Sequence, residues 1–250
     1  MQNLFYIFCV SVMLSVAAVP THAVESYGNP EDPVVAEVLG MQIRTKDPAE
    51  MQSVIGAKIF HEYAKQNKIV ASQKDIDRYM ALIAKFMRDD RKKRDARRVE
   101  IQQQLKTGSL PAERTKHLQS ELATLEDLHK EALAEDSGSK QEKEEILKVQ
   151  QATAKSIIEQ WMINKALYHQ YGGRIIHQQT GPDPIDAVYD FLKEQQKKEA
   201  FKILNKSFDE FFWEYFANEN KHCFYEHGSQ EERRAFDKAP WQEEQSRGKQ

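Results

Sequence analysis

Apolar side chains recur three and four residues apart along much of this chain, and this periodicity limits the fold more than any other feature. Met51, Ile55 and Ile59 belong to one such stripe, and the aromatic run 208–216 repeats the spacing nearer the carboxyl end. Only 10 Gly and 8 Pro interrupt the 250 residues, which favours helices over a fold built from many turns. We predict a mainly α fold: a helical domain with a long charged helical hairpin and a small two-stranded β element.

The first 23 residues differ in kind from the rest, because they contain no Asp, Glu, Lys or Arg. The apolar run 4–19 has the length of a signal-peptide core and is short for a membrane span, and residues 21–23 supply small side chains at the usual cleavage positions. Residues 1–3 lack the usual basic side chain, so an uncleaved anchor is the alternative. We expect 1–23 to be a signal peptide that directs the protein to the periplasm, where it is peripheral to the membrane at most.

The remaining sequence divides into segments of different composition. We expect a linker at 24–33, a helical segment with a short β-prone start at 34–87, a charged helical hairpin at 88–139, a long helix followed by an aromatic-rich helical region at 140–227, and a polar tail at 228–250.

The hairpin is predicted from a change of character after Met87. Seven Arg or Lys and three Asp lie within 88–98, while Leu118, Leu122 and Leu125 lead a thin apolar stripe that predicts a narrow coiled-coil-like seam. A solvated helix face balanced by nearby acids explains the basic run better than a docking patch for an acidic partner does.

Two β-prone segments flank the predicted helical core, at 34–38 and 175–176. We expect them to pair as a two-stranded ribbon. Within the polar tail, Phe236 and Trp241 are the side chains that could dock on the rest of the protein.

No complete enzyme motif is present. His61-Glu62 begins like the zinc-protease helix signature, but Lys65 stands where the second His is required. We therefore expect neither catalysis nor a cofactor. One loose group of metal-capable side chains keeps a metal-handling protein open as an alternative: His222, Cys223, Glu226 and His227.

The aromatic run places most of its large side chains on one helix face. A core role is favoured for this stripe, but any exposed part of it would be the natural place to hold an unfolded apolar segment. The candidate client-binding residues are Phe208, Phe211, Phe212, Trp213, Tyr215 and Phe216.

Residues 34–85 carry a longer pattern. It runs through the valine-rich segment 34–40 and Ile43, a capped helix, the helical segment 59–69, and then Ala71-Ser72, Asp75, Ile76 and Tyr79. This order resembles the N-terminal domain of the SurA-like periplasmic chaperones and foldases, over roughly one fifth of the chain. In two places the sequence departs from the family pattern: Leu39 replaces the usual Asn, and Lys68 replaces the usual Gly.

The resemblance implies a chaperone-type helical domain without isomerase activity. The family often inserts a parvulin prolyl-isomerase domain, but 88–139 is too short and too charged to be one, and the family's glycine-rich stretch is missing. By the same resemblance, the long helix ending at Tyr171 would return to pack on helices 48–67 and 73–87.

The favoured function is therefore ATP-independent binding of unfolded or assembling envelope proteins, such as outer-membrane proteins. The absence of a nucleotide-binding motif agrees with a compartment that lacks ATP. A formal net charge of −3 gives no field that would attract nucleic acid. A structural or adaptor protein that docks one specific partner through the hairpin remains the other alternative.

Overall fold

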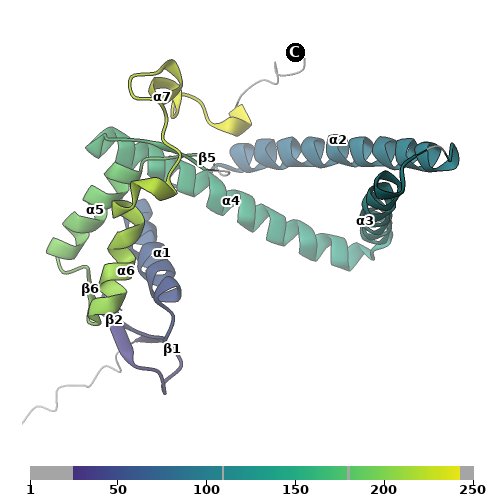
Figure 1. Ribbon diagram of the computed structural model, residues 1–250. Coiled ribbons are helices and arrows are strands. Elements are labelled where there is room, and N and C mark those ends of the chain that lie inside the picture. Colours follow the sequence, from purple (N-terminus) through teal and green to yellow (C-terminus); the bar gives the residue numbers. More distant parts are fainter. Residues whose placement is uncertain (1–24, 109, 179–180, 243–250) are drawn as a thin grey trace, which may run out of the picture.

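The computed structural model describes residues 25–108, 110–178 and 181–242, and within these it is mainly helical (Figure 1). The expected signal peptide lies outside the described residues. The long helices are α1 (Pro48–Gln66), α2 (Gln73–Lys106), α3 (Ala112–Ser137) and α4 (Lys140–Tyr171), followed by the shorter α5 (Ile185–Lys197), α6 (Lys206–Ala217) and α7 (Gln230–Arg234). Within the part of the chain that is described, no helix combines the length and the apolar character needed to cross a membrane.

Local capping sets where the helices begin. The side chain of Asp47 accepts a hydrogen bond from the backbone N–H of Ala49 at the start of α1, and the hydroxyl of Ser72 accepts one from the N–H of Asp75 at the start of α2. Ser139 opens α4 with a reciprocal capping box. Each cap satisfies backbone donors that the first turn of a helix leaves unpaired.

A four-stranded sheet covers one end of the helical body. Its order is β1 (Ser26–Gly28), β3 (Met41–Arg44), β2 (Val34–Val38) and β6 (Phe201–Ile203). The β1–β3 pair is parallel, whereas β2 runs antiparallel to both of its neighbours. This sheet brings the chain beyond α5 back against the first hairpin.

The predicted pairing of 34–38 with 175–176 is wrong. Strand β2 pairs instead with β3 and β6, while Ile176 begins β4 (Ile176–Gln178), which pairs with β5 (Gly181–Asp183) in a separate two-stranded sheet. Leu39 and Gly40 both adopt positive φ, which suits a tight hairpin turn between β2 and β3. That two-residue turn lets β3 pair with one edge of β2 at a small cost in chain entropy, and β6 occupies the other edge, so no edge of β2 is left for 175–176.

The body has one main apolar core beneath the larger sheet. Side chains of α1, α4, α5 and α6 meet those of the strands there, and Met51, Phe191, Phe201 and Phe212 are among its buried members. The long helix α4 packs on both α1 and α2, as the resemblance implies. Because α4 also runs on beyond the body, it links the body to a projecting arm (Figure 1).

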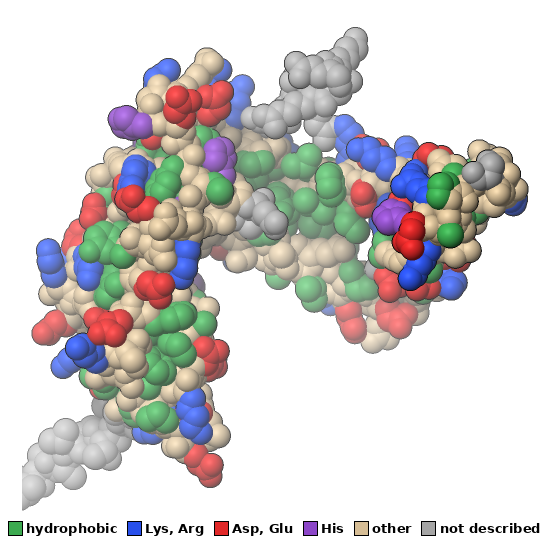
Figure 2. Space-filling model, viewed as in Figure 1, with side chains coloured by type: hydrophobic (Ala, Val, Ile, Leu, Met, Phe, Trp, Pro, Cys, Tyr) green, Lys and Arg blue, Asp and Glu red, His purple; other side chains and the backbone are tan. Residues whose placement is uncertain are grey.

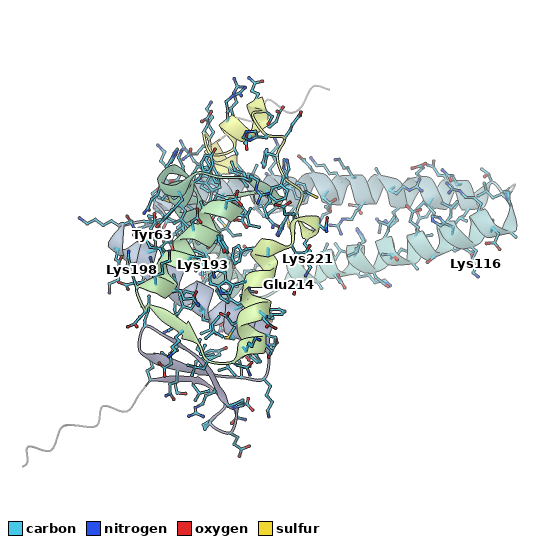
Figure 3. The ribbon with its side chains drawn as sticks, turned by 60° about the vertical axis from the view of Figure 1, so that its left-hand side comes forward. Tyr63, Lys116, Lys193, Lys198, Glu214 and Lys221 are labelled. Atoms are coloured by element: carbon cyan, nitrogen blue, oxygen red, sulfur yellow. The ribbon has the colours of Figure 1, made fainter. Side chains whose placement is uncertain are left out.

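The arm consists of α2, α3 and the first half of α4. Helix α2 is continuous over 34 residues, so the change of composition at Met87 is not a helix boundary. Helix α3 returns alongside α2, and Lys116 near its start lies at the far end of the arm (Figure 3). Ile101 and Leu118 are fully buried in the seam, and Arg97 binds Glu121 across it through two hydrogen bonds. The predicted charged hairpin is confirmed.

A second apolar cluster fastens the carboxyl-terminal segment over the base of the arm. Phe236 and Trp241 are both buried, and Trp241 lies edge-on to Trp161 of α4 at a ring distance of 5.5 Å. The indole N–H of Trp241 donates to Asp75 at 3.2 Å. The prediction that these two aromatic residues dock is confirmed, and their contacts join α2 to α4 where the two helices leave the body.

Candidate functional site

The aromatic stripe of α6 is mostly part of the core. Phe212 is only 1% exposed, and Phe208, Trp213, Tyr215 and Phe216 are half-buried. Phe211 alone among the six predicted client-binding residues has an exposed side chain. The structure thus agrees with the core role favoured for this stripe, whereas client binding by the six residues stays a prediction.

A pocket of about 370 Å³ lies in the body between α1, α4, α5 and α6. Its wall is largely apolar or aromatic, and three residues of the predicted stripe contribute to it. The lining residues are Gln52, Gly56, Phe60, Gln160, Asn164, Asp183, Val188, Leu192, Phe212, Tyr215 and Phe216. The volume falls in the range of pockets that bind small ligands.

Most polar groups in the wall of this pocket have partners within the protein. The amide of Asn164 donates to the carbonyl of Pro182 and accepts a hydrogen bond from Gln160 at 2.8 Å. Gln52 donates to the carbonyl of Phe212 at 3.1 Å. These hydrogen bonds help to fix the helices that form the wall, and each of the three side chains keeps further donor or acceptor sites.

Asp183 is the exception. Among the described residues, none donates a hydrogen bond to its carboxylate or forms an ion pair with it. Burial raises the pKa of Asp183 to about 6, an effect that the nearby His222 opposes. The imidazole of His222 itself is held by the carbonyl of Tyr215 at 2.7 Å.

The sequence suggests a turn at 180–184 and no role for Asp183. In the structure Gly181–Asp183 instead forms strand β5, immediately before α5. No local pattern could have identified the residue, because α1 and α6, which enclose its carboxylate, lie far away in the sequence.

A second candidate surface lies on the arm, where α2 and α4 diverge (Figure 1). At the base of the arm the apolar stripes of both helices face each other, so Ile76 and Ile158 are buried. Farther out the same stripes continue, but the helices have separated and the side chains meet solvent. We call this surface the splayed face; it comprises Ile83, Phe86 and Met87 of α2 and Leu147 of α4.

The splayed face is unusually exposed for residues of this kind. Phe86 is 69% exposed and Met87 56%, and Leu147 of α4 is 46% exposed. Figure 2 shows apolar side chains gathered in the hollow between the body and the tip of the arm. Contiguous exposed apolar surface of this sort marks interaction sites more often than isolated exposed residues do.

Part of the basic run of the hairpin is paired with acids on the same hairpin. Arg94 pairs with Asp90, Arg98 lies 3.5 Å from Asp95, and Arg97 pairs with Glu100 as well as with Glu121. These pairs are of the kind expected for a solvated helix face whose charge is balanced by nearby acids.

The possible metal-binding group at 222–227 does not converge. Across the described ranges, no three side chains of His, Cys, Asp or Glu are arranged to hold a metal ion. His222 is bonded to a backbone carbonyl, Cys223 is exposed, and His227 lies 3.8 Å from Glu232. The geometry therefore gives the metal-handling alternative no support.

Comparison with known proteins does not identify a family. No family model matches the chain, and no curated protein or solved structure matches it. The resemblance of residues 34–85 to the SurA-like N-terminal domain therefore stays a prediction.

Proposed function

We propose that this protein is an exported, ATP-independent chaperone-like protein that holds apolar segments of unfolded or assembling envelope proteins. The splayed face is the observation that carries the proposal. Its residues continue stripes that are buried at the base of the arm, so the protein presents core-like surface with nothing from the described chain covering it. An extended apolar segment laid between α2 and α4 would complete that packing.

Binding of such a segment is expected to be reversible. A segment that buries about 400 Å² of apolar area gains about 10 kcal/mol at the usual coefficient. Much of that gain is offset by the conformational entropy that the segment loses when it is ordered and by the translational and rotational freedom that it loses on binding. The remainder gives weak, exchangeable holding, and flexible side chains such as Met87 adapt to different sequences.

Other features support the same proposal. The strand hairpin at β2 and β3, helix α1 and the capped start of α2 follow one another in the order that the resemblance requires. The outer faces of the arm are rich in charged side chains, which limits self-association through the exposed apolar residues.

Suppression of aggregation of an unfolded outer-membrane protein tests the proposal. We expect the exported chain to suppress aggregation at near-stoichiometric ratios. A triple variant of the splayed face (Phe86→Ser, Met87→Ser, Leu147→Ser) should lose most of this activity. Because all three side chains are about half exposed or more, the fold should tolerate the changes.

A matched control removes three exposed apolar side chains elsewhere, through Val70→Ser, Val99→Ser and Leu204→Ser. Val99 lies on the opposite side of α2 from the splayed face, as helical geometry places it. Equal activity of the two triple variants would contradict the assignment to the splayed face. No suppression by the unaltered chain would contradict the chaperone-like function itself.

A partner-specific adaptor is the second candidate, and the rigidity of the arm favours it. The seam between α2 and α3 is fixed by the buried pair Ile101 and Leu118 and by the Arg97–Glu121 bonds, so the two helices present a defined surface. Deletion of the hairpin 88–139 would then abolish one pull-down interaction while leaving aggregation unchanged.

A further inference from the structure

The pocket in the body has the features of a binding site separate from the splayed face. Gln160 at the pocket and Leu147 on the splayed face are 13 positions apart on α4, which corresponds to about 20 Å along the helix. The pocket wall is built from helices, and its amide side chains are hydrogen-bonded to one another or to backbone carbonyls. A ligand here would therefore meet a preformed shape.

The apolar residues of the wall indicate what kind of ligand would fit the pocket. Phe60 of α1, Val188 and Leu192 of α5, and Phe212 and Phe216 of α6 surround a volume of about 370 Å³. Aromatic side chains on two sides suit a flat ring, which gains from edge-to-face contacts as well as from area burial.

Asp183 supplies the charge that selects the ligand. A half-buried carboxylate without a donor is costly, and the neighbouring Asp186 shows the usual remedy: its oxygens accept three hydrogen bonds from Arg174. No described side chain does the same for Asp183. Lys193 of α5 lies over the ring of Trp213 at 3.4 Å, and the imidazole of the nearby His222 is bonded to the carbonyl of Tyr215.

We propose that this pocket binds a small organic cation with an aromatic body, in which a single ammonium or amidinium group pairs with Asp183 and the ring occupies the apolar cavity. The pairing gives the carboxylate the donor that the chain does not provide, and it does so in a partly desolvated place where a charged hydrogen bond is strong. The proposal does not depend on the chaperone-like function.

Titration of the protein without the expected signal peptide (residues 24–250) with three matched indoles tests this assignment. Tryptamine, tryptophol and indolepropionate share the ring and carry an ammonium, a hydroxyl and a carboxylate, respectively. Isothermal titration calorimetry should show tryptamine binding at least tenfold more tightly than the other two. Equal binding of the three, or binding of none, would overturn the proposal.

Two variants locate the site. Asp183→Asn should weaken tryptamine at least tenfold and leave tryptophol unchanged, whereas Asp190→Asn, which removes an exposed carboxylate of α5, should alter neither. Gly56→Leu should abolish binding of both ligands, because a side chain at Gly56 extends toward Phe60 in the pocket. Retained tryptamine affinity in Asp183→Asn would refute the role of the carboxylate.

A measurement on the unaltered chain guards against variants that fold poorly. Amide chemical shifts during tryptamine titration should change at Gly56, Phe60 and Phe216 and stay constant at Phe86 and Leu118. Changes confined to the arm would place the ligand elsewhere and overturn the assignment.

Discussion

The replacement Asp183→Asn should make the protein more stable at neutral pH and have a smaller effect in acid. Burial raises the pKa of Asp183 from the ordinary value of 3.8 to about 6. A difference of about 2.2 between the folded and unfolded pKa values corresponds to about 3 kcal/mol. Because the folded value is the higher one, the ionised carboxylate destabilises the folded state above pH 6, and this penalty disappears as the pH falls towards 3.8.

Asparagine keeps the shape of the side chain and removes its ionisation. The advantage of the variant over the unaltered chain should therefore grow with pH, by about 2 kcal/mol between about pH 4.5 and about pH 7.5. Urea unfolding of both proteins at the two pH values, extrapolated to zero denaturant, measures this change. Asp190→Asn serves as the control, because it makes the same chemical change at an exposed position of α5.

An advantage of Asp183→Asn that stays constant with pH would show that the carboxylate is solvated or paired in the folded protein. The pocket argument would then lose its charged group. Since a protonated His222 holds the pKa of Asp183 lower, the same pair of proteins in a His222→Gln background should show a larger pH dependence. A smaller one would contradict the assigned electrostatics.

Two further predictions concern stability. Gly56→Ala should raise the free energy of unfolding, measured by urea denaturation, by about 0.5–1 kcal/mol. Gly56 lies inside α1, and a methyl group there meets only the Phe60 ring, at an ordinary contact distance of 3.8 Å. A loss of stability would show that the surroundings of Gly56 are tighter than the structure indicates. Trp241→Ala should lower the free energy of unfolding by about 3 kcal/mol, because a buried ring packed on Trp161 and Tyr79 is lost. Amide hydrogen exchange should become faster in 225–242, while the protection of α6 stays unchanged. Unchanged exchange at Gln242 would contradict the docking of Trp241.

The starts of α1 and α2 were accessible from the sequence because their causes are local, whereas the end of α2 was not. Asp47 and Ser72 cap α1 and α2 within one turn of where their bonds are made, and the 3.6-residue period fixes which side chains share a face. Leu118 was assigned to the hairpin seam for the same reason, and it is fully buried there.

Strand pairing and exposure were decided only by the tertiary structure. β6 joins β2 across more than 160 residues, and its three residues carry no signal that names their partner. Ile76 and Phe86 belong to one periodic stripe, yet the first is buried and the second exposed, because α2 and α4 are in contact at one point and apart at the other. The burial of the Asp183 carboxylate arises in the same way, because the fold brings helices from distant parts of the sequence around it. The periodicity of a sequence shows which side chains share one face of a helix. Whether that face is buried depends on the distance to the neighbouring helix, which only the tertiary structure sets.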